Sequence, residues 1–166
     1  MFKGISEVQF PVKFISDFGG FHMRLTTRTS LAMKTLMFCA VNSDRLVRRN
    51  EIAACSDASE NHLAQVIHLL GLKGYLRTQR GRAGGLELAR LPREITVGQV
   101  FRDFEAVLPF SDCIGQENGK CPLAGACRLT CVMTEALDAF YARLDQTTLA
   151  DLVEGNSPLT KILQAA

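Results

Sequence analysis

The sequence lacks the long apolar run from which transmembrane helices are built. A helix needs about 18 or more consecutive apolar residues to cross a bilayer, and the 166-residue chain has no such run. The first 22 residues also lack the continuous apolar stretch and the small-residue cleavage site of a signal peptide. We therefore expect a cytoplasmic protein with one main domain, long enough to bury a core.

The chain also lacks the sequence patterns of common enzymes. Its clustered glycines, Gly81, Gly84 and Gly85, have the spacing of a turn and are not followed by the Lys-Ser/Thr of a nucleotide-binding P-loop. No two cysteines are spaced as Cys-x-x-Cys, and no group of acids and bases accompanies the thiols. We therefore expect a protein that is not an enzyme.

What the chain does contain is six cysteines, which in a cytoplasmic protein indicate metal or redox chemistry before disulfides. Cys113, Cys121 and Cys127 lie in a polar, glycine-bearing segment and are separated by seven and then five residues. Thiolates gathered in this way suit an iron–sulfur cluster, or a zinc ion completed by Cys131, one helical turn further on. The spacing favours the cluster over zinc, and free redox thiols are the third alternative.

The charge of the chain is unevenly distributed although its net value is only +2. Residues 43–93 carry nine Lys and Arg against five acids, whereas residues 94–166 carry five against ten. This asymmetry predicts that only the first part of the chain binds a polyanion.

Two short helices joined by a polar turn are predicted at residues 49–55 and 59–73. The hydroxyl of Ser59 can cap the second helix, and an apolar stripe follows at helical spacing through Leu63, Val66, Ile67 and Leu70. This is the pattern of a helix-turn-helix. Short polar side chains near the start of the second helix suit base edges in the major groove; they are Ser59, Asn61, His62 and Gln65.

Two alternating segments, residues 75–79 and 86–89, flank a basic, glycine-rich loop and predict a β-hairpin. With the helix pair, the hairpin predicts a winged helix-turn-helix, a mostly α fold with a two-stranded β wing. Arg80 and Arg82 at the wing tip suit a minor groove, and Arg48 suits a phosphate contact. DNA binding is therefore the strongest functional inference that the residues support.

Further helices are predicted on both sides of this motif. The helix at residues 26–42 is apolar on nearly all sides, which favours burial between a domain core and a second subunit. Cys39 on this helix and Cys55 on the next are expected to be inert core residues. The longest helix, residues 127–146, carries an apolar stripe that pairing with the same helix of a second copy would bury. A last helix starts near Thr148 and is interrupted at Ser157-Pro158.

These elements divide the chain into four expected parts. Residues 1–22 form an extension, from upstream sequence or an artificial leader, with a docking arm as the alternative. Residues 23–93 form the DNA-binding domain, and residues 94–126 form a linking helix and the cysteine loop. Residues 127–166 form the dimerisation helix and the tail.

From Met23 to its end the chain resembles the Rrf-two family of bacterial transcription regulators. The matching motifs are Met23-Arg-Leu-Thr, Ser59-Glu-Asn-His-Leu-Ala-Gln-Val-Ile, Arg80-Gly-Arg-Ala-Gly-Gly-Leu-Glu-Leu-Ala, Ile95-Thr-Val-Gly-Gln-Val-Phe and Cys121-Pro-Leu-Ala-Gly-Ala-Cys127-Arg-Leu. The resemblance implies a homodimeric repressor that binds operator DNA. It also implies an iron–sulfur cluster on Cys113, Cys121 and Cys127, of the 4Fe–4S type in preference to 2Fe–2S.

Within the family, the tail from Thr148 resembles that of members that sense nitric oxide, whereas the cysteine spacing also resembles iron-responsive members. We favour a regulator that senses nitric oxide, and iron-responsive, redox-responsive or zinc-stabilised regulators are the alternatives. One departure matters. Nitric-oxide-sensing members complete the cluster with an acidic residue from the first helix of the partner, and the matching position here is Ser30. Because serine is a poor iron ligand, the fourth ligand is Cys131, Ser30 of the partner subunit, another side chain or an exogenous group.

Overall fold

The computed structural model describes residues 25–56, 58–81, 83–105 and 127–164. The described chain is mostly helical, with a two-stranded antiparallel sheet. The elements, in chain order, are α1 (Thr27–Val41), α2 (Arg49–Ser56), α3 (Glu60–Leu72), β1 (Leu76–Gln79), β2 (Gly85–Leu88), the 3₁₀ helix η2 (Pro92–Glu94), α4 (Val97–Phe104), α5 (Arg128–Asp145), α6 (Leu149–Val153) and α7 (Ser157–Gln164). The predicted winged helix-turn-helix is confirmed.

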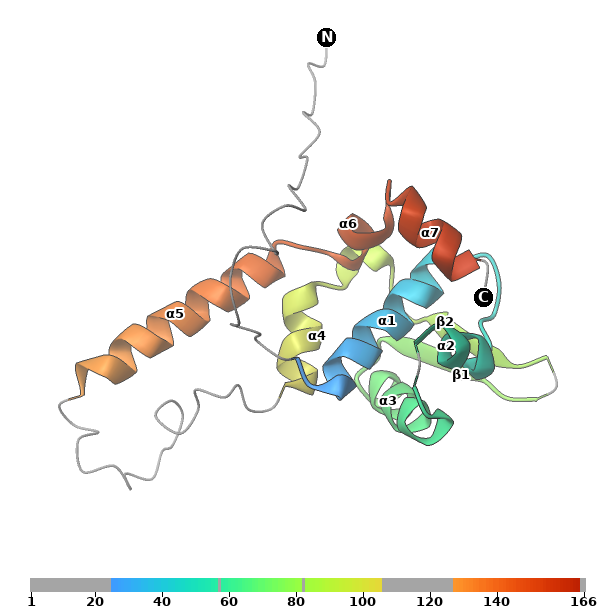
Figure 1. Ribbon diagram of the computed structural model, residues 1–166, viewed down its shortest axis with the longest axis horizontal. Coiled ribbons are helices and arrows are strands. Elements are labelled where there is room, and N and C mark those ends of the chain that lie inside the picture. Colours follow the sequence, from blue (N-terminus) through green and yellow to red (C-terminus); the bar gives the residue numbers. More distant parts are fainter. Residues whose placement is uncertain (1–24, 57, 82, 106–126, 165–166) are drawn as a thin grey trace, which may run out of the picture.

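Helix α1 runs through the middle of the molecule, and α5 projects away from it (Figure 1). The side chain of Thr26 caps α1 by accepting a hydrogen bond from the N–H of Thr29 at 3.2 Å. Most of the helix is buried, and it contacts α2, α3, β2, α4, α6 and α7. The chain itself therefore covers most of α1, and a contact between this helix and a second subunit stays a prediction.

Helices α2 and α3 form the predicted helix-turn-helix on one side of α1. Leu63, Val66, Ile67 and Leu70 of α3 are buried, as their spacing predicted. After α3, Gly74 adopts a positive φ of 73°, which glycine tolerates without a steric penalty. The N–H of Tyr75 donates to the carbonyl of Leu70 at 2.9 Å and turns the chain into the wing.

The wing is the hairpin of β1 and β2, in which Arg77 faces Glu87 and Thr78 faces Leu86. Val47, in the connection between α1 and α2, adds a bridge to this hairpin. Its N–H donates to Leu86 at 2.9 Å, and the N–H of Leu86 donates back at 2.8 Å. The wing is therefore attached to the segment that precedes the helix-turn-helix as well as to the segment that follows it.

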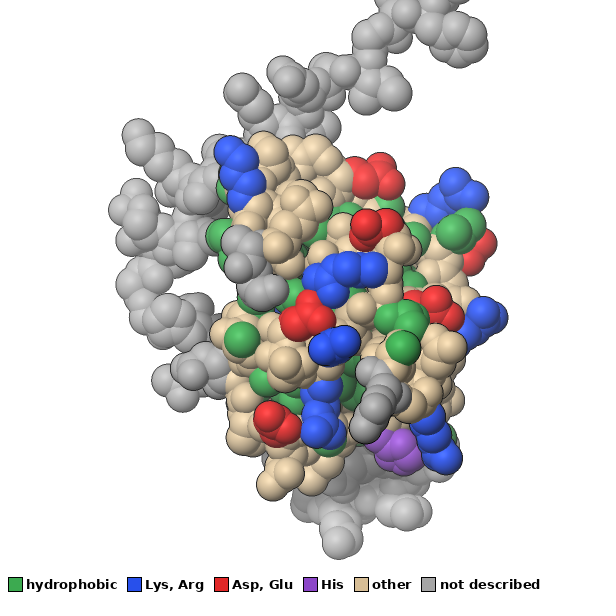
Figure 2. All heavy atoms as spheres, turned by 90° about the vertical axis from the view of Figure 1, so that its right-hand side faces the viewer, with side chains coloured by type: hydrophobic (Ala, Val, Ile, Leu, Met, Phe, Trp, Pro, Cys, Tyr) green, Lys and Arg blue, Asp and Glu red, His purple; other side chains and the backbone are tan. Residues whose placement is uncertain are grey.

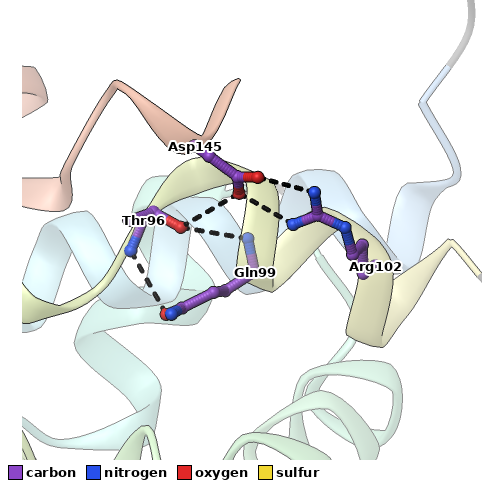
Figure 3. A network of polar contacts seen from close by, with 4 residues as sticks. All are labelled: Thr96, Gln99, Arg102 and Asp145. Carbon is purple, nitrogen blue, oxygen red and sulfur yellow. Dashed lines mark hydrogen bonds and ion pairs between the residues drawn. The ribbon is translucent and has the colours of Figure 1, made fainter. Parts of the chain in front are cut away.

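Helix α4 is joined to the end of α5 by a polar network (Figure 3). Arg102 of α4 donates to both carboxylate oxygens of Asp145, at 2.7 and 2.6 Å. These hydrogen bonds lower the pKa of Asp145. The guanidinium of Arg102 also lies over the ring of Tyr141, 4.4 Å from its centroid. Because this is a bidentate contact with a planar partner, it sets the direction of α5 relative to α4.

The C-terminal segment differs from the predicted helix with a break at Ser157-Pro158. The structure has two short helices, α6 and α7, and the break lies at residues 154–156, where Gly155 has a φ of 71°. Pro158 lies in the first turn of α7, a position that needs no N–H donor. Among the described residues, no helix combines the length and the apolar character needed to span a membrane.

The contact between α4 and α5 depends on Gly98, which is buried in the first turn of α4. A Cβ added there would meet the carboxylate of Asp145 and would lie 3.0 Å from its backbone nitrogen. We expect Gly98→Ala to lower the free energy of unfolding by about 1–3 kcal/mol through this overpacking. Thermal and urea denaturation would measure the change.

Gly71→Ala is the matched control, because the nearest atom to its added Cβ lies 4.0 Å away. This helical position should gain stability, by up to about 1 kcal/mol. Equal effects of the two substitutions would contradict the assignment of Gly98 to the α4–α5 contact.

Candidate nucleic-acid interface

The outer face of α3 carries polar side chains in a continuous stripe. Asn61, Gln65 and His68 are exposed and lie on the side opposite the buried stripe. Ser59 caps the helix by accepting from the N–H of His62 at 3.3 Å. His62 itself is half-buried and lies away from the centre of the exposed face. Asn61 and Gln65 are therefore the predicted residues best placed to enter a major groove, and His68 extends their stripe.

A groove of about 700 Å³ separates α3 from the wing. Ile67 and His68 of α3 line one side, and the wing residues Thr78, Gln79 and Arg80 line the other. His68 and Gln79 were not predicted as interface residues, and for Gln79 the position in the sequence does not indicate that the wing folds back beside α3. The α3 spacing could have identified His68, which follows Asn61 by seven residues.

The start of α2 closes the same groove with Arg48 and Arg49. The guanidinium of Arg49 donates to Glu60 of α3 at 3.1 Å, and both side chains are exposed. Arg45, a third arginine near the start of α2, is held 2.6 Å from Glu51 and does not line the groove. Arg48 and Arg49 thus line the groove, a position that suits the phosphate contact predicted for Arg48.

The basic side chains of the wing differ in their surroundings. Arg80 is exposed beside Gly81, whereas Arg82 lies outside the described residues. Arg90 leaves the end of the hairpin and stacks over the ring of Tyr75, 4.6 Å from its centroid, so it supports the wing. Figure 2 shows lysine and arginine side chains spread across this side of the molecule, with a histidine at its lower edge.

The structure describes one of the three predicted cluster ligands, Cys127, whereas Cys113 and Cys121 lie outside the described residues. Cys127 is half-buried immediately before α5, and Cys131 is exposed one turn further on. The backbone N–H and the hydroxyl of Thr130, followed by the N–H of Leu129, lower the pKa of Cys127. These groups favour the charged thiolate, although its sulfur accepts no hydrogen bond that caps α5 within the described residues. Thiolate is the form that binds metals.

The other described cysteines have different surroundings. Cys39 is buried, and this burial raises the pKa of its thiol to about 12. Cys55 is half-buried and lines a small apolar cleft between α1, α2 and α7. Ser30 is half-buried in the first turn of α1. Within the described ranges, no three side chains of His, Cys, Asp or Glu come together as a metal site.

An exposed polar helix face beside a basic hairpin defines a winged-helix DNA-binding protein. Residues 25–155 match the family model of Rrf2, described as an iron-dependent transcriptional regulator. This is the Rrf-two family that the sequence motifs resemble, and the chain belongs to it. It is accordingly a transcription regulator and not an enzyme.

Three relatives illustrate the similarity. The HTH-type transcriptional regulator NsrR of Geobacillus kaustophilus is 39% identical over 143 residues, which cover 86% of this chain and 97% of the relative. The HTH-type transcriptional repressor NsrR of Streptomyces coelicolor is 41% identical over 133 residues, covering 79% and 88%. The solved structure of T. potens IscR has a TM-score of 0.60 and 26% identity, and covers 80% of this chain and 87% of that one.

Asn61, which is predicted to contact bases, and Arg48, which is predicted to contact phosphate, should respond differently to substitution. The probe is a duplex that this protein enriches from a random library, compared with an unrelated duplex of equal length. Asn61→Ala should weaken binding to the enriched duplex by about 1–3 kcal/mol, because it removes a base contact. Arg48→Gln should weaken both duplexes alike and reduce the slope of affinity against salt by about one, because it removes a phosphate contact.

Fluorescence anisotropy at several salt concentrations would measure both effects. Gln164→Ala, at the exposed end of α7, is the control and should change neither affinity. Equal weakening of both duplexes by Asn61→Ala would contradict the role of α3 in reading bases.

Proposed function

We propose that this protein is a cytoplasmic, homodimeric transcriptional repressor whose affinity for operator DNA is controlled by an iron–sulfur cluster that senses nitric oxide. The observation that carries the proposal is the place of Cys127. It lies at the start of α5, whose far end is joined to α4 beside the DNA-reading half. The proposal assigns DNA binding to residues 23–93, the cluster to residues 94–126 with Cys127, and dimerisation to residues 127–166.

The donor set suits the proposed cluster. Cys113, Cys121 and Cys127 provide three thiols, and the partly exposed Cys127 has a lowered pKa, in keeping with a thiolate ligand. Cys131, exposed one helical turn after Cys127, is the fourth thiol nearest in sequence. Ser30 of the partner subunit is the alternative by position. When bound, the cluster would supply the chemistry that reacts with nitric oxide.

The names of the relatives support a repressor, and the resemblance of the tail from Thr148 to nitric-oxide-sensing members supports the choice of signal. Regulators named NsrR are similar over most of this chain, and one of them is named a repressor. The family description, an iron-dependent regulator, favours the second candidate, in which iron supply controls the same cluster. The two candidates use the same cysteines and DNA-binding surface, so the effector distinguishes them.

The surface of α5 supports the proposed dimer. Within the described part of the chain, no residue of α5 is buried. Phe140, Tyr141 and Leu144 near its end pack against the core, but Leu129 and Val132 near its start are 58% and 59% exposed. An apolar stripe that continues beyond the chain's own core is suited to a second copy related by a twofold axis.

The cluster is tested by its colour and by its effect on DNA binding. Protein purified without oxygen should absorb near 400 nm, which a zinc protein does not. Cys113→Ser, Cys121→Ser and Cys127→Ser should each abolish this absorbance, because each removes a thiolate ligand. Cys55→Ser, at a half-buried cysteine outside the proposed ligand set, should keep it. A colourless wild-type protein that contains zinc would contradict the cluster.

The effector is tested on the same protein with the enriched duplex. Nitric oxide should lower its affinity about a hundredfold, which corresponds to roughly 3 kcal/mol of coupling. Loss of affinity with an iron chelator but not with nitric oxide would favour the iron-responsive candidate. Cys131→Ser tests the fourth ligand, since a changed spectrum is expected only if its sulfur binds the cluster.

The dimer is tested by placing a charge on the exposed stripe of α5. Val132→Glu should shift the protein from dimer to monomer in sedimentation equilibrium, because the interface would bury an unpaired carboxylate. Ala142→Glu, also exposed but outside the apolar stripe of α5, is the control and should remain dimeric. A wild-type protein that is monomeric at micromolar concentration would contradict the proposal.

A further inference from the structure

The corner between the recognition helix and the wing is fixed by one carboxylate. Lys73 and Tyr75 lie on the two sides of Gly74, between α3 and β1. Asp103 of α4 accepts a hydrogen bond from the Lys73 ammonium through one oxygen and from the Tyr75 hydroxyl through the other, both at 2.7 Å. The backbone carbonyl of Tyr75 accepts from the N–H of Ala89 at 2.9 Å, so the returning strand is attached at the same point.

The protonation states of Tyr75 and Asp103 favour these hydrogen bonds at neutral pH. Burial, followed by the hydrogen bond to Asp103, raises the pKa of Tyr75 to about 12, so its hydroxyl keeps the donated proton at neutral pH. Partial burial alone would raise the pKa of Asp103. The hydrogen bonds from Lys73 and Tyr75 outweigh it, so the pKa lies below its usual value and the carboxylate stays charged.

Helix α4 is itself held from two other directions, which makes it a firm support. Arg102 donates to Asp145 of α5 (Figure 3). Glu105, buried at the end of α4, accepts from the backbone N–H and the hydroxyl of Thr26 at 2.8 and 3.0 Å, at the start of α1. Asp103 therefore ties the corner to a helix that is already fixed to α1 and α5.

We propose that Asp103, acting through Tyr75 and Lys73, is a positioning residue for DNA recognition. It sets the angle between α3 and the wing. The wing tip at Arg80 lies five residues beyond Tyr75, which is roughly 16 Å of extended chain. A tilt of about 10° at the corner would therefore move Arg80 by about 3 Å, the length of a hydrogen bond. A displacement of this size would prevent the wing from contacting the minor groove of the DNA while α3 contacts the major groove.

This inference needs DNA as the ligand but does not depend on the proposed cluster or its effector. It goes beyond the proposed function because Asp103 does not line the groove, and the two side chains that donate to it among the described residues, Lys73 and Tyr75, are not among those predicted to read DNA. A residue that only stabilises the fold would affect all duplexes in proportion to its effect on stability. A positioning residue should selectively weaken the duplex that needs α3 and the wing at the same time.

The test compares four variants of the full chain on the enriched duplex and on the unrelated duplex. Asp103→Ala should lower affinity for the enriched duplex about tenfold and change affinity for the unrelated one less than twofold. Tyr75→Phe, which keeps the buried ring and removes only the hydroxyl, should show the same selectivity. The double variant should be no weaker than Asp103→Ala alone, because both changes break one contact. Asp103→Glu, which keeps both acceptor oxygens, should recover part of the loss.

Asp151→Ala is the matched control. Asp151 also accepts two short hydrogen bonds, from the N–H and the hydroxyl of Thr148 at 2.8 and 2.7 Å, but it lies on α6, away from the wing. Asp151→Ala should lower thermal stability without changing the ratio of the affinities for the enriched and the unrelated duplex. Equal losses on both duplexes, additive effects of Asp103→Ala and Tyr75→Phe, or no loss would each overturn the inference. An absence of response to nitric oxide would instead count only against the proposed function.

Discussion

Helix α1 has to be covered on nearly every side, and the rest of the structure depends on this constraint. Its residues Ala32 and Leu36 are fully buried, and even Thr29 and Thr35 are enclosed, with the hydroxyl of Thr35 donating to the carbonyl of Leu31 at 2.8 Å. Burial of an apolar helix removes a large area from water. The helices of the DNA-binding motif, α4 and the C-terminal helices therefore gather around α1 and acquire their relative positions from it.

Polar contacts then set directions that apolar packing leaves adjustable. Arg102, Asp103 and Glu105 at the end of α4 contact α5, the base of the wing and the start of α1, respectively. The cysteine-bearing residues 106–126 follow α4 directly in the chain. The DNA-reading half and the helix proposed for dimerisation thus meet at one short helix, next in sequence to the proposed cluster ligands.

The candidate interface was predicted in part. Asn61 and Gln65 could be assigned to the exposed face of α3 because helical spacing separates them from the buried stripe. His68 and Gln79 could not be grouped together, since only the folded wing brings them to one groove. In the structure Glu51 holds Arg45 and the Tyr75 ring lies against Arg90, contacts that the sequence did not predict.

The sequence by itself determined the local structure: the cap at Ser59, the buried stripe of α3, and the β-hairpin that follows α3. These features follow from periodicity and from hydrogen bonds between near neighbours, which the order of residues specifies. Only the tertiary structure decided that Asp103 meets Tyr75, 28 residues away, and that Glu105 meets Thr26, 79 residues away. Such pairs arise when packing around α1 brings distant segments together, and no local pattern encodes which residues will meet.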